Sequence, residues 1–381
     1  MSLSPAQRLA EALEQRRQSN SLRRLSPPDP SFTDFCSNDY LGLARSSVLR
    51  DRVLQEWEKL SQENATQWLG SGGSRLLAGD SSYAEQLEKE LAGFYRSEAG
   101  LLFNSGYAAN TGLFSALPKK GDTVLYDELI HASVRDGLRM SAAKSWSFQH
   151  NDVVHLEALL RKAEGSVYVA AEAVYSMDGD ECPLEAIVSL CEQYGAALIL
   201  DEAHSNGLYG GEGEGLAVAK GLHDKIFARV MTFGKAPGCH GAFVAGSNDL
   251  REYLVNFSRP FIYSTALPVH DLAVIHAAVN SFRVMHEARR KLSELIAYFR
   301  GNLSGKTRFQ LLPSASAIQA VLIPGNEEAR AVAENCRKEK LDVRAILSPT
   351  VPAGEERLRI ILHSFNTTSE VDQLIKVIAK S

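Results

Sequence analysis

The sequence predicts an α/β fold built on a mostly parallel central sheet, with a smaller α+β domain at the C-terminal end. Two observations lead to this prediction. Between about residues 50 and 265, short apolar runs alternate with longer stretches of helical periodicity. The short runs are continuously apolar, which is typical of parallel strands covered by helices on both faces. Beyond residue 265 the pattern changes to long helices and a few short strands.

Composition narrows the class of protein. The 381 residues are enough for a large domain and a smaller one. Hydrophobic residues make up 45% and charged residues 23%, which is typical of an ordered core. The formal net charge of −5 gives no general attraction to nucleic acid or to anionic membranes. No apolar stretch is long enough to span a bilayer. We therefore expect neither nucleic acid nor membrane among the partners.

The first residues and the cysteines indicate the compartment. Residues 1–24 are charged and lack the apolar core of a signal peptide. The five cysteines are scattered and show no paired framework, which fits free thiols in a reducing cytoplasm. Cys182 and Cys191 alone would make an incomplete metal site, so we expect no metal. These observations predict a cytoplasmic protein.

The elements follow in chain order. Residues 1–48 form the first part, with an amphipathic helix over 1–20 that places Leu9 and Leu13 on one face. Residues 49–268 form the large domain, with helices such as Tyr83–Tyr95 and Leu184–Tyr194. Its predicted strands are Gly100–Phe103, Thr123–Tyr126, Ser166–Ala171, Ala196–Leu200, Val230–Phe233 and Gly241–Ala245. Residues 269–381 form the small domain, in which 270–305 is one long helix or two that bridge both domains. Its other predicted elements are Ala317–Ile323, Glu327–Glu339, Arg357–Leu362 and Ser369–Ala379.

A lysine and an aspartate follow two of the predicted strands. Asp201 ends the apolar run 196–200, and Lys235 follows the apolar run 225–230. In an open α/β sheet, strand ends of the same polarity meet at one crevice. Pyridoxal phosphate (PLP) needs a lysine amine for a Schiff base and an acid beside its pyridine nitrogen. A solvated lysine and a capping aspartate are the simpler interpretations. Glycines at 234, 238 and 241 and the apolar surroundings favour the functional one.

Further polar residues near strand ends have two interpretations each. Gly106 and Tyr107 begin a predicted helix that follows a strand. The free N–H groups of a helix start can bind phosphate, but the segment is also compatible with an ordinary strand–helix turn. Ser176 and Thr232 carry hydroxyls that suit a phosphate, a ring hydroxyl or a local turn. Spacing alone does not decide between these interpretations.

Two histidines, His131 and His204, also follow predicted strands, and His204 is part of a segment that occurs in another class of protein. His131 is either a structural residue of a turn or a residue that stacks on a cofactor ring. His204 is either a capping residue or a residue that faces the same crevice as Asp201. Asp201–His204 reads Asp-Glu-Ala-His, which also occurs in the ATPase box of some helicases. Such an ATPase needs a phosphate loop, G-x-x-x-x-G-K-[ST], and the sequence contains none. No dinucleotide fingerprint or serine-hydrolase elbow occurs either.

Taken together, these stretches resemble the α-oxoamine synthases, a branch of the fold-type I PLP-dependent enzymes. The resemblance runs along nearly the whole chain. Its marks are Ser37–Leu43, Gly70–Arg75, Ser105–Asn110, Val174–Asp180, Asp201–His204 and Thr232–Lys235. It implies a PLP-dependent transferase fold of type I, a homodimer with shared active sites, and decarboxylative condensation of an amino acid with an acyl thioester.

Three segments indicate the substrates that the resemblance implies. Leu22–Arg24, Ile262–Pro268 and Pro349–Gly354 are similar to the members that join L-alanine to a pimeloyl thioester, carried by CoA or by acyl carrier protein. Members that use other pairs, such as glycine with acetyl-CoA, are the alternative.

The resemblance also implies a role for each site residue. The catalytic residues would be Lys235, His131, Asp201 and His204. The cofactor contacts would be Gly106, Tyr107, His131, Ser176, Asp201, His204, Thr232 and Lys235, with Ser264 and Thr265 contacting the phosphate bound in the partner subunit. The substrate contacts would be Arg23, Asn38, His131, Thr350 and Arg359, of which Arg359 would bind the amino-acid carboxylate bidentately.

Overall fold

The computed structural model describes residues 3–19, 21–23, 25–62 and 69–381, and these divide into two compact units. The larger unit comprises Asn38–Ser293 and His363–Phe365, and the smaller comprises Met1–Ser37, Glu294–Leu362 and Asn366–Ser381. None of the described helices is both long and apolar enough to cross a membrane. The sequence-based domain boundaries at 48 and 268 stay a prediction.

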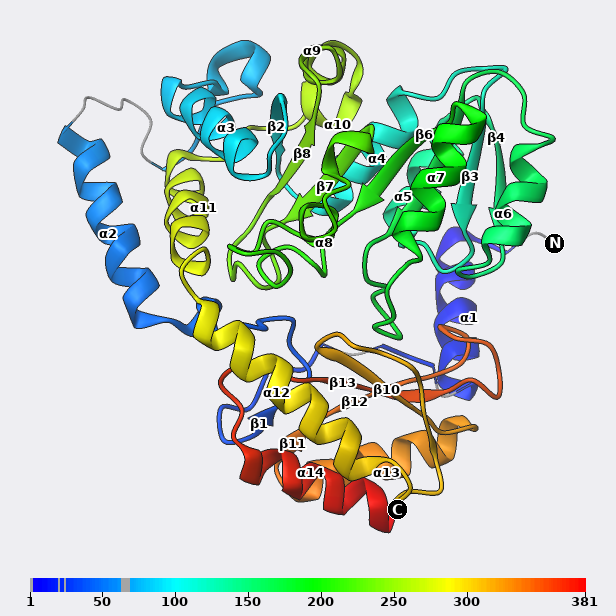
Figure 1. The fold of residues 1–381 in the computed structure, drawn as a ribbon. Coiled ribbons are helices and arrows are strands. Elements are labelled where there is room, and N and C mark those ends of the chain that lie inside the picture. The colour runs from blue at the N-terminus through cyan, green and yellow to red at the C-terminus, as the bar shows by residue number, and fades with distance from the viewer. Residues whose placement is uncertain (1–2, 20, 24, 63–68) are drawn as a thin grey trace. The chain divides into compact units, whose positions relative to one another are not determined.

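Within the described residues, a seven-stranded sheet forms the centre of the larger unit (Figure 1). Its order is β2-β8-β7-β6-β5-β3-β4. The neighbours from β4 to β7 are all parallel, and only β8 runs antiparallel to both of its neighbours. The strands are β2 Ala99–Phe103, β3 Thr123–Asp127, β4 Lys144–Phe148, β5 Val167–Glu172, β6 Ala197–Asp201, β7 Ala228–Thr232 and β8 Ala242–Gly246. The predicted α/β fold with a mostly parallel sheet is confirmed.

Helices cover both faces of this sheet. Alternate residues of each strand point to opposite sides, and the residues on both sides are apolar. On one face, residues such as Ala170 and Ile199 pack with helices α4 (Gly106–Ala116), α5 (Ala132–Met140), α9 (Asn248–Phe257) and α10 (Arg259–Ile262). On the other face, Val169 and Leu198 pack with α6 (Val153–Leu160), α7 (Leu184–Tyr194) and α8 (Leu216–Ala219). Asp201 continues the alternation of Ile199 and therefore points to the side of α4.

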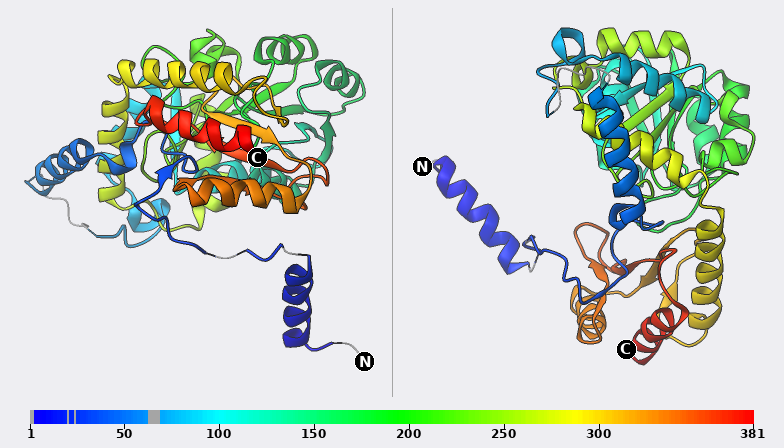
Figure 2. Two further views of the ribbon diagram at one scale, coloured as in Figure 1. Left: turned by 90° about the horizontal axis from the view of Figure 1, so that it is seen from below. Right: turned by 90° about the vertical axis from the view of Figure 1, so that its left-hand side faces the viewer.

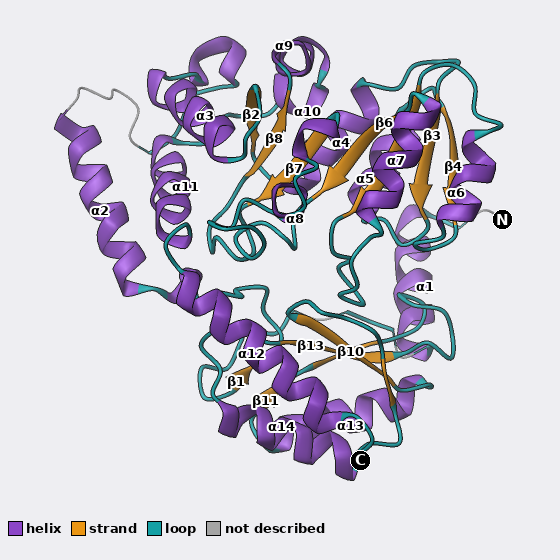
Figure 3. Cartoon of the chain, viewed as in Figure 1, coloured by secondary structure: helices purple, strands orange, loops and turns teal. Residues whose placement is uncertain are grey.

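The remaining elements of the larger unit lie beside this core. Helix α2 (Ser47–Gln62) contacts α11 (Val269–Phe282), and α3 (Ser82–Phe94) contacts both α11 and β2. Three short turns of helix complete the unit: η1 Leu43–Arg45, η2 Arg75–Gly79 and η3 His223–Lys225. Figure 3 shows how helices and strands alternate through this part of the chain.

The smaller unit is an α+β structure, seen from two further directions in Figure 2. Its described strands form a four-stranded sheet in the order β12-β13-β10-β9 and a parallel pair of β1 with β11. The strands are β1 Thr33–Asp34, β9 Gln310–Leu311, β10 Ile318–Leu322, β11 Leu341–Asp342, β12 Arg344–Ile346 and β13 Arg357–Ile361. Its helices are α1 Pro5–Gln18, α13 Asn326–Lys338, α14 Thr368–Lys380 and the second part of α12, which spans His286–Leu303 and begins in the larger unit.

The N-terminal helix differs in burial from the rest of the smaller unit. Helix α1 begins with a capping box at Ser4 and has no buried residue. Leu9 and Leu13 are both exposed. The predicted residues 1, 2 and 20 of this helix, and Arg24 of the segment that follows, lie outside the described residues.

Candidate active site

The ends of neighbouring strands bring polar residues to one edge of the sheet. Glu172 and Asp201 end β5 and β6 and are register partners. Asp201 pairs in turn with Val230, two residues before the end of β7 at Thr232. A pocket of about 230 Å³ lies at this edge. The predicted site residues that line it are Asn38, Gly106, Tyr107, His131, Asp201, His204, Thr232 and Lys235.

Lys235 lies in the turn that joins β7 to β8. Its Nζ donates to Thr232 Oγ1 over 3.4 Å, and its side chain is half-buried. The turn closes with a hydrogen bond of 2.8 Å from the Gly238 nitrogen to the Lys235 carbonyl. Gly238 has a φ of +68°, and a Cβ there would lie 2.3 Å from the backbone nitrogen of Ala44. Glycine is therefore required for the turn to lie against residues 43–44.

Asp201 is buried and fixed by two donors. Its Oδ2 accepts from Asn110 Nδ2 at 2.7 Å, and its Oδ1 accepts from the Ala203 nitrogen at 2.9 Å. Asn110 also donates to Ser133 Oγ at 3.0 Å. Its own buried Oδ1 has no hydrogen-bond partner among the described residues. Asn110 is a pocket residue that the sequence reasoning missed, although it is a rare polar side chain on the buried face of α4.

Glu172 is a second pocket residue that the sequence reasoning missed. Its side chain is only 3% exposed, and it lies beside Asp201 on the neighbouring strand. Burial raises the pKa of Glu172 well above its ordinary value, and the negative charge of Asp201 raises it further. Lys235 and the backbone of His131 and Ser176 oppose this shift. Burial and the neighbouring carboxylate therefore both favour the protonated form of Glu172.

The two histidines are held in different ways. His131 caps α5, and its Nδ1 lies 2.7 Å from Ser133 Oγ. Desolvation lowers the pKa of His131, although the residue is exposed, and Lys235 lowers the pKa further while Asp201 opposes the shift. The ring is therefore neutral at pH 7. His204 is 5% exposed, and its Nδ1 lies 2.6 Å from Tyr40 Oη.

The first turn of α4 forms another wall of the pocket. Ser105 caps this helix by accepting from the Ala108 nitrogen at 3.1 Å. The N–H groups at Gly106 and Tyr107 are in the first turn, where a helix cannot satisfy its own donors. A Cβ on Gly106 would lie 2.4 Å from Thr232 Cγ2, so glycine allows the helix start to approach β7. This wall offers N–H donors and the positive end of a helix to an anion.

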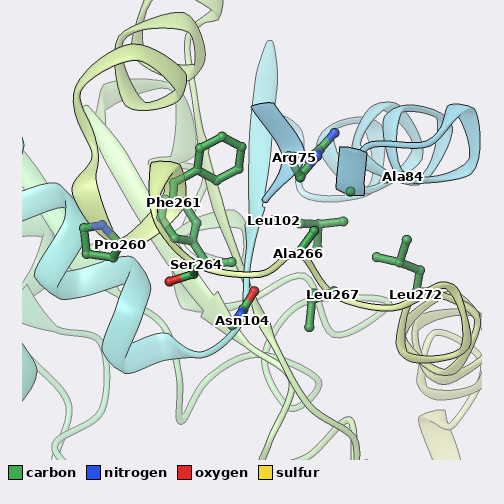
Figure 4. A pocket seen from close by; sticks show the side chains of 12 residues that line it. Arg75, Ala84, Leu102, Asn104, Pro260, Phe261, Ser264, Ala266, Leu267 and Leu272 are labelled. Atoms are coloured by element: carbon green, nitrogen blue, oxygen red, sulfur yellow. The ribbon is translucent and has the colours of Figure 1, made fainter. Parts of the chain in front are cut away.

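Three predicted cofactor contacts lie outside this lining. Ser176 follows β5 in the turn beyond Glu172. Ser264 lines a separate hollow together with Asn104, as Figure 4 shows. Thr265 is next in the chain, and its carbonyl accepts from Asn104 Nδ2 at 2.8 Å.

Three predicted substrate contacts belong to the smaller unit and are described within it. Arg23 is exposed and follows helix α1. Thr350 is exposed in a turn after β12, where its nitrogen donates to the Leu347 carbonyl at 2.8 Å. Arg359 is partly buried at the centre of β13, between β10 and β12. The roles of these three residues stay predictions.

The Asp-Glu-Ala-His segment divides between two environments. Asp201 lines the pocket, whereas Glu202 is fully buried and lies 3.5 Å from the guanidinium of Arg229. Glu202 also accepts from Ser205 Oγ at 2.7 Å. Glu202 therefore lies outside the pocket lining and forms a buried ion pair, which gives it a structural role.

These residues fit PLP, the cofactor that the sequence implies. The Asp201 carboxylate, held by two donors, can pair with the protonated pyridine nitrogen of PLP, and Lys235, which lines the same pocket, can react with its aldehyde. The start of α4 and the Thr232 hydroxyl suit a phosphate. The unpartnered Asn110 Oδ1 adds a buried acceptor beside the same carboxylate.

Comparisons with known proteins agree with this geometry. Residues 30–378 match the family model described as "Aminotransferase class I and II". The curated 8-amino-7-oxononanoate synthase of Emericella nidulans is 41% identical, over 97% of this chain and 94% of its own. Serine palmitoyltransferase from S. paucimobilis, solved with a bound PLP–myriocin aldimine, is 27% identical with a TM-score of 0.87 over 98% and 96% of the two chains. The 8-amino-7-oxononanoate synthase of Francisella tularensis is 28% identical with a TM-score of 0.79 over 92% and 98%. The predicted resemblance is confirmed, and the chain belongs to the aminotransferase class I and II family, in its α-oxoamine synthase branch.

Proposed function

We propose that this chain is a PLP-dependent acyltransferase of biotin biosynthesis. It condenses L-alanine with pimeloyl-CoA or pimeloyl-acyl carrier protein, with loss of CO2, to give 8-amino-7-oxononanoate. The observation that supports this most strongly is the placement of Lys235 and the buried carboxylate of Asp201 on one pocket. The curated relative named above, at 41% identity over nearly the whole chain, supports the choice of substrates.

The cofactor end of the pocket would use residues on β6, β7 and α4 and in the loops beside them. Asp201 holds a proton at the pyridine nitrogen of PLP, and Asn110 keeps the Asp201 carboxylate oriented. His131 covers the ring, and its neutral state avoids repulsion with the protonated nitrogen. His204 hydrogen-bonds the ring oxygen. Gly106, Tyr107, Ser176 and Thr232 hold the phosphate or the ring.

The reacting end centres on Lys235. When bound, PLP supplies a carbonyl group that reacts with amines and a ring that withdraws electrons from the adjacent carbon. In the resting enzyme Lys235 Nζ would hold that carbonyl group. With alanine in the site, Nζ would be the general base that accepts the Cα proton of alanine. Asn38, Arg23, Thr350 and Arg359 contact the substrates, and Arg359 binds the alanine carboxylate.

The proposal includes a homodimer, in which Ser264 and Thr265 reach the phosphate of the partner subunit. Exposed apolar side chains near these residues support an interface, because Leu77 is 85% exposed and Tyr263 is 72% exposed. Light scattering after size-exclusion chromatography should give twice the mass of the 41.7 kDa chain. A fully active monomer would contradict the shared site.

All five cysteines are free thiols in the described residues, which supports a cytoplasmic location.

The assay that tests the function is product mass after incubation with PLP, L-alanine and a pimeloyl thioester. Parallel reactions contain pimeloyl-CoA or pimeloyl-acyl carrier protein, and CoA release is also measured with glycine and acetyl-CoA. We expect 8-amino-7-oxononanoate from alanine and little turnover of the glycine pair. Turnover of the glycine pair alone would move the chain to the glycine C-acetyltransferases, and no PLP binding at all would reject the proposal.

A further inference from the structure

We infer that His150 is a positioning residue for the pocket, because it joins the segment that leads to His131 with the turn that carries Ser176. Neither the sequence resemblance nor the proposed mechanism uses His150. The inference rests on the proposed function only where it concerns PLP, because the joining of the two segments is a property of the protein alone.

His150 lies between two carboxylates. Its Nδ1 is 2.9 Å from Asp127 Oδ1, and its Nε2 is 2.8 Å from Asp180 Oδ2. An ionised carboxylate oxygen can only accept a hydrogen bond, so both ring nitrogens must carry a proton. The Tyr175 ring meets the imidazole edge-on, with 4.5 Å between centroids. The contacts therefore describe an imidazolium that bridges two anions.

The first carboxylate fixes the segment before His131. Asp127 ends β3 and has no exposed surface. Besides the imidazole, it accepts from the Leu129 nitrogen at 2.8 Å and from the Asn151 nitrogen at 2.9 Å. These bonds shape the three residues, 128–130, that separate Asp127 from the pocket residue His131.

The second carboxylate fixes the turn that carries Ser176. The Asp180 carbonyl accepts from the Tyr175 nitrogen at 2.9 Å, and the Tyr175 carbonyl accepts from the Gly179 nitrogen at 2.9 Å. Ser176 lies between these anchors. Asn151 Nδ2 donates to the Asp180 carboxylate at 2.7 Å, so both His150 and its neighbour hold this turn.

The bridge depends on charge. Burial lowers the pKa of His150, but the hydrogen bonds that its ring donates to Asp127 and Asp180 outweigh this effect and raise the pKa to about 10. The other titratable groups that face this residue are the buried phenol of Tyr175 and Glu128, whose carboxylate accepts from the His150 backbone nitrogen at 3.0 Å. A folded-state pKa above the ordinary value means that the stabilisation is complete below about pH 6.5 and is lost as the pH rises toward 10.

The test compares His150→Gln with a matched control in the same segment. A glutamine carries its donors on one nitrogen and has no charge, so the buried Asp127 and the partly buried Asp180 lose their shared cation. The control is Asp152→Ala, which removes the N-cap of α6 two residues away. Asp152 contacts neither segment of the bridge. Both variants should lower the melting temperature.

Hydrogen exchange on the full-length protein without PLP measures the bridge directly. In His150→Gln, amides of residues 127–131 and 175–181 should exchange about tenfold or more faster than in the wild type, and in Asp152→Ala they should not. Equal exchange in the wild type and His150→Gln would overturn the inference, whatever the protein catalyses. Recovery of slow exchange in His150→Gln with Asp180→Asn, which removes one anion, would support the role of charge.

A PLP titration measures the consequence for the pocket. At pH 7 the dissociation constant of PLP should rise about tenfold or more in His150→Gln and stay near the wild-type value in Asp152→Ala. The difference between the wild type and His150→Gln should shrink as the pH approaches 10, because the imidazolium then loses its proton in the wild type. Similar weakening in both variants would reduce His150 to a general stabilising role. Failure of the wild type to bind PLP would reject the proposed function and leave the exchange result to stand alone.

Discussion

Replacing Asp201 by asparagine should separate two effects of this residue, on folding and on cofactor binding. The carboxylate accepts one buried hydrogen bond from Asn110 and one from the Ala203 nitrogen. Asparagine has a single oxygen, so one of these donors would face an amide NH2 group. An unpaired buried donor costs about 1–3 kcal/mol in the free energy of unfolding. PLP also loses its anion, and removing one member of a buried charge pair costs about 2–5 kcal/mol of binding.

An exchange of side chains tests this reasoning. In the double variant Asn110→Asp with Asp201→Asn, the amide at 201 donates to the carboxylate at 110, and the Ala203 nitrogen again has an acceptor. The free energy of unfolding should return to within about 1 kcal/mol of the wild type. The anion, however, now stands on α4 and not on β6, so PLP binding should stay about 30-fold or more weaker.

Urea unfolding without PLP and an absorbance titration with PLP measure the two quantities separately. If Asp201→Asn binds PLP within about threefold of the wild type, its charge does not serve the cofactor. If the double variant recovers cofactor binding together with stability, Asp201 acts only as a hydrogen-bond acceptor. Either result would refute the assignment of the ring nitrogen to Asp201.

Three further substitutions probe the same pocket. Lys235→Ala should abolish the visible absorbance of the PLP complex, and a normal spectrum would reject Lys235 as the amine. Glu172→Gln should bind PLP within about threefold of the wild type, because an amide resembles a neutral acid; a tenfold loss in the titration would indicate an ionised Glu172. Gly106→Ala should weaken PLP binding severalfold, since its Cβ would lie 2.4 Å from Thr232 Cγ2. Its control is Gly93→Ala, where a Cβ meets no atom within 4 Å and helix propensity should raise the melting temperature.

Much of the fold could be predicted because the core strands are continuously apolar. Strand β6, for example, differs from its predicted range by one residue at each end. Strand β4 (Lys144–Phe148) was missed because it lies at the edge of the sheet, where only Phe148 is buried. Its polar residues face solvent, so the sequence carries no apolar run there.

The site was predictable where a reactive residue type follows an apolar run, as with Asp201 and Lys235. Glu172 follows such a run as well, so the same signal was present but was not used. Asn110 is different, because its importance comes from a contact with a residue 91 positions away. No local pattern records that pairing. The bridge at His150 was also missed, since its two carboxylates come from separate segments.

The reversal of direction at β8 has a consequence for the order of assembly. The lysine turn joins two strands that are neighbours in both sequence and space, so it closes a loop of only nine residues between Thr232 and Ala242. The contact of Asn110 with Asp201 spans 91 residues, and that of Tyr40 with His204 spans 164. Short loops cost less entropy to close and form faster than long ones. During refolding, the turn that carries Lys235 should therefore form before Asp201 and the start of α4 reach their places. The return of cofactor binding should then report the docking of these distant segments and not the formation of the turn itself.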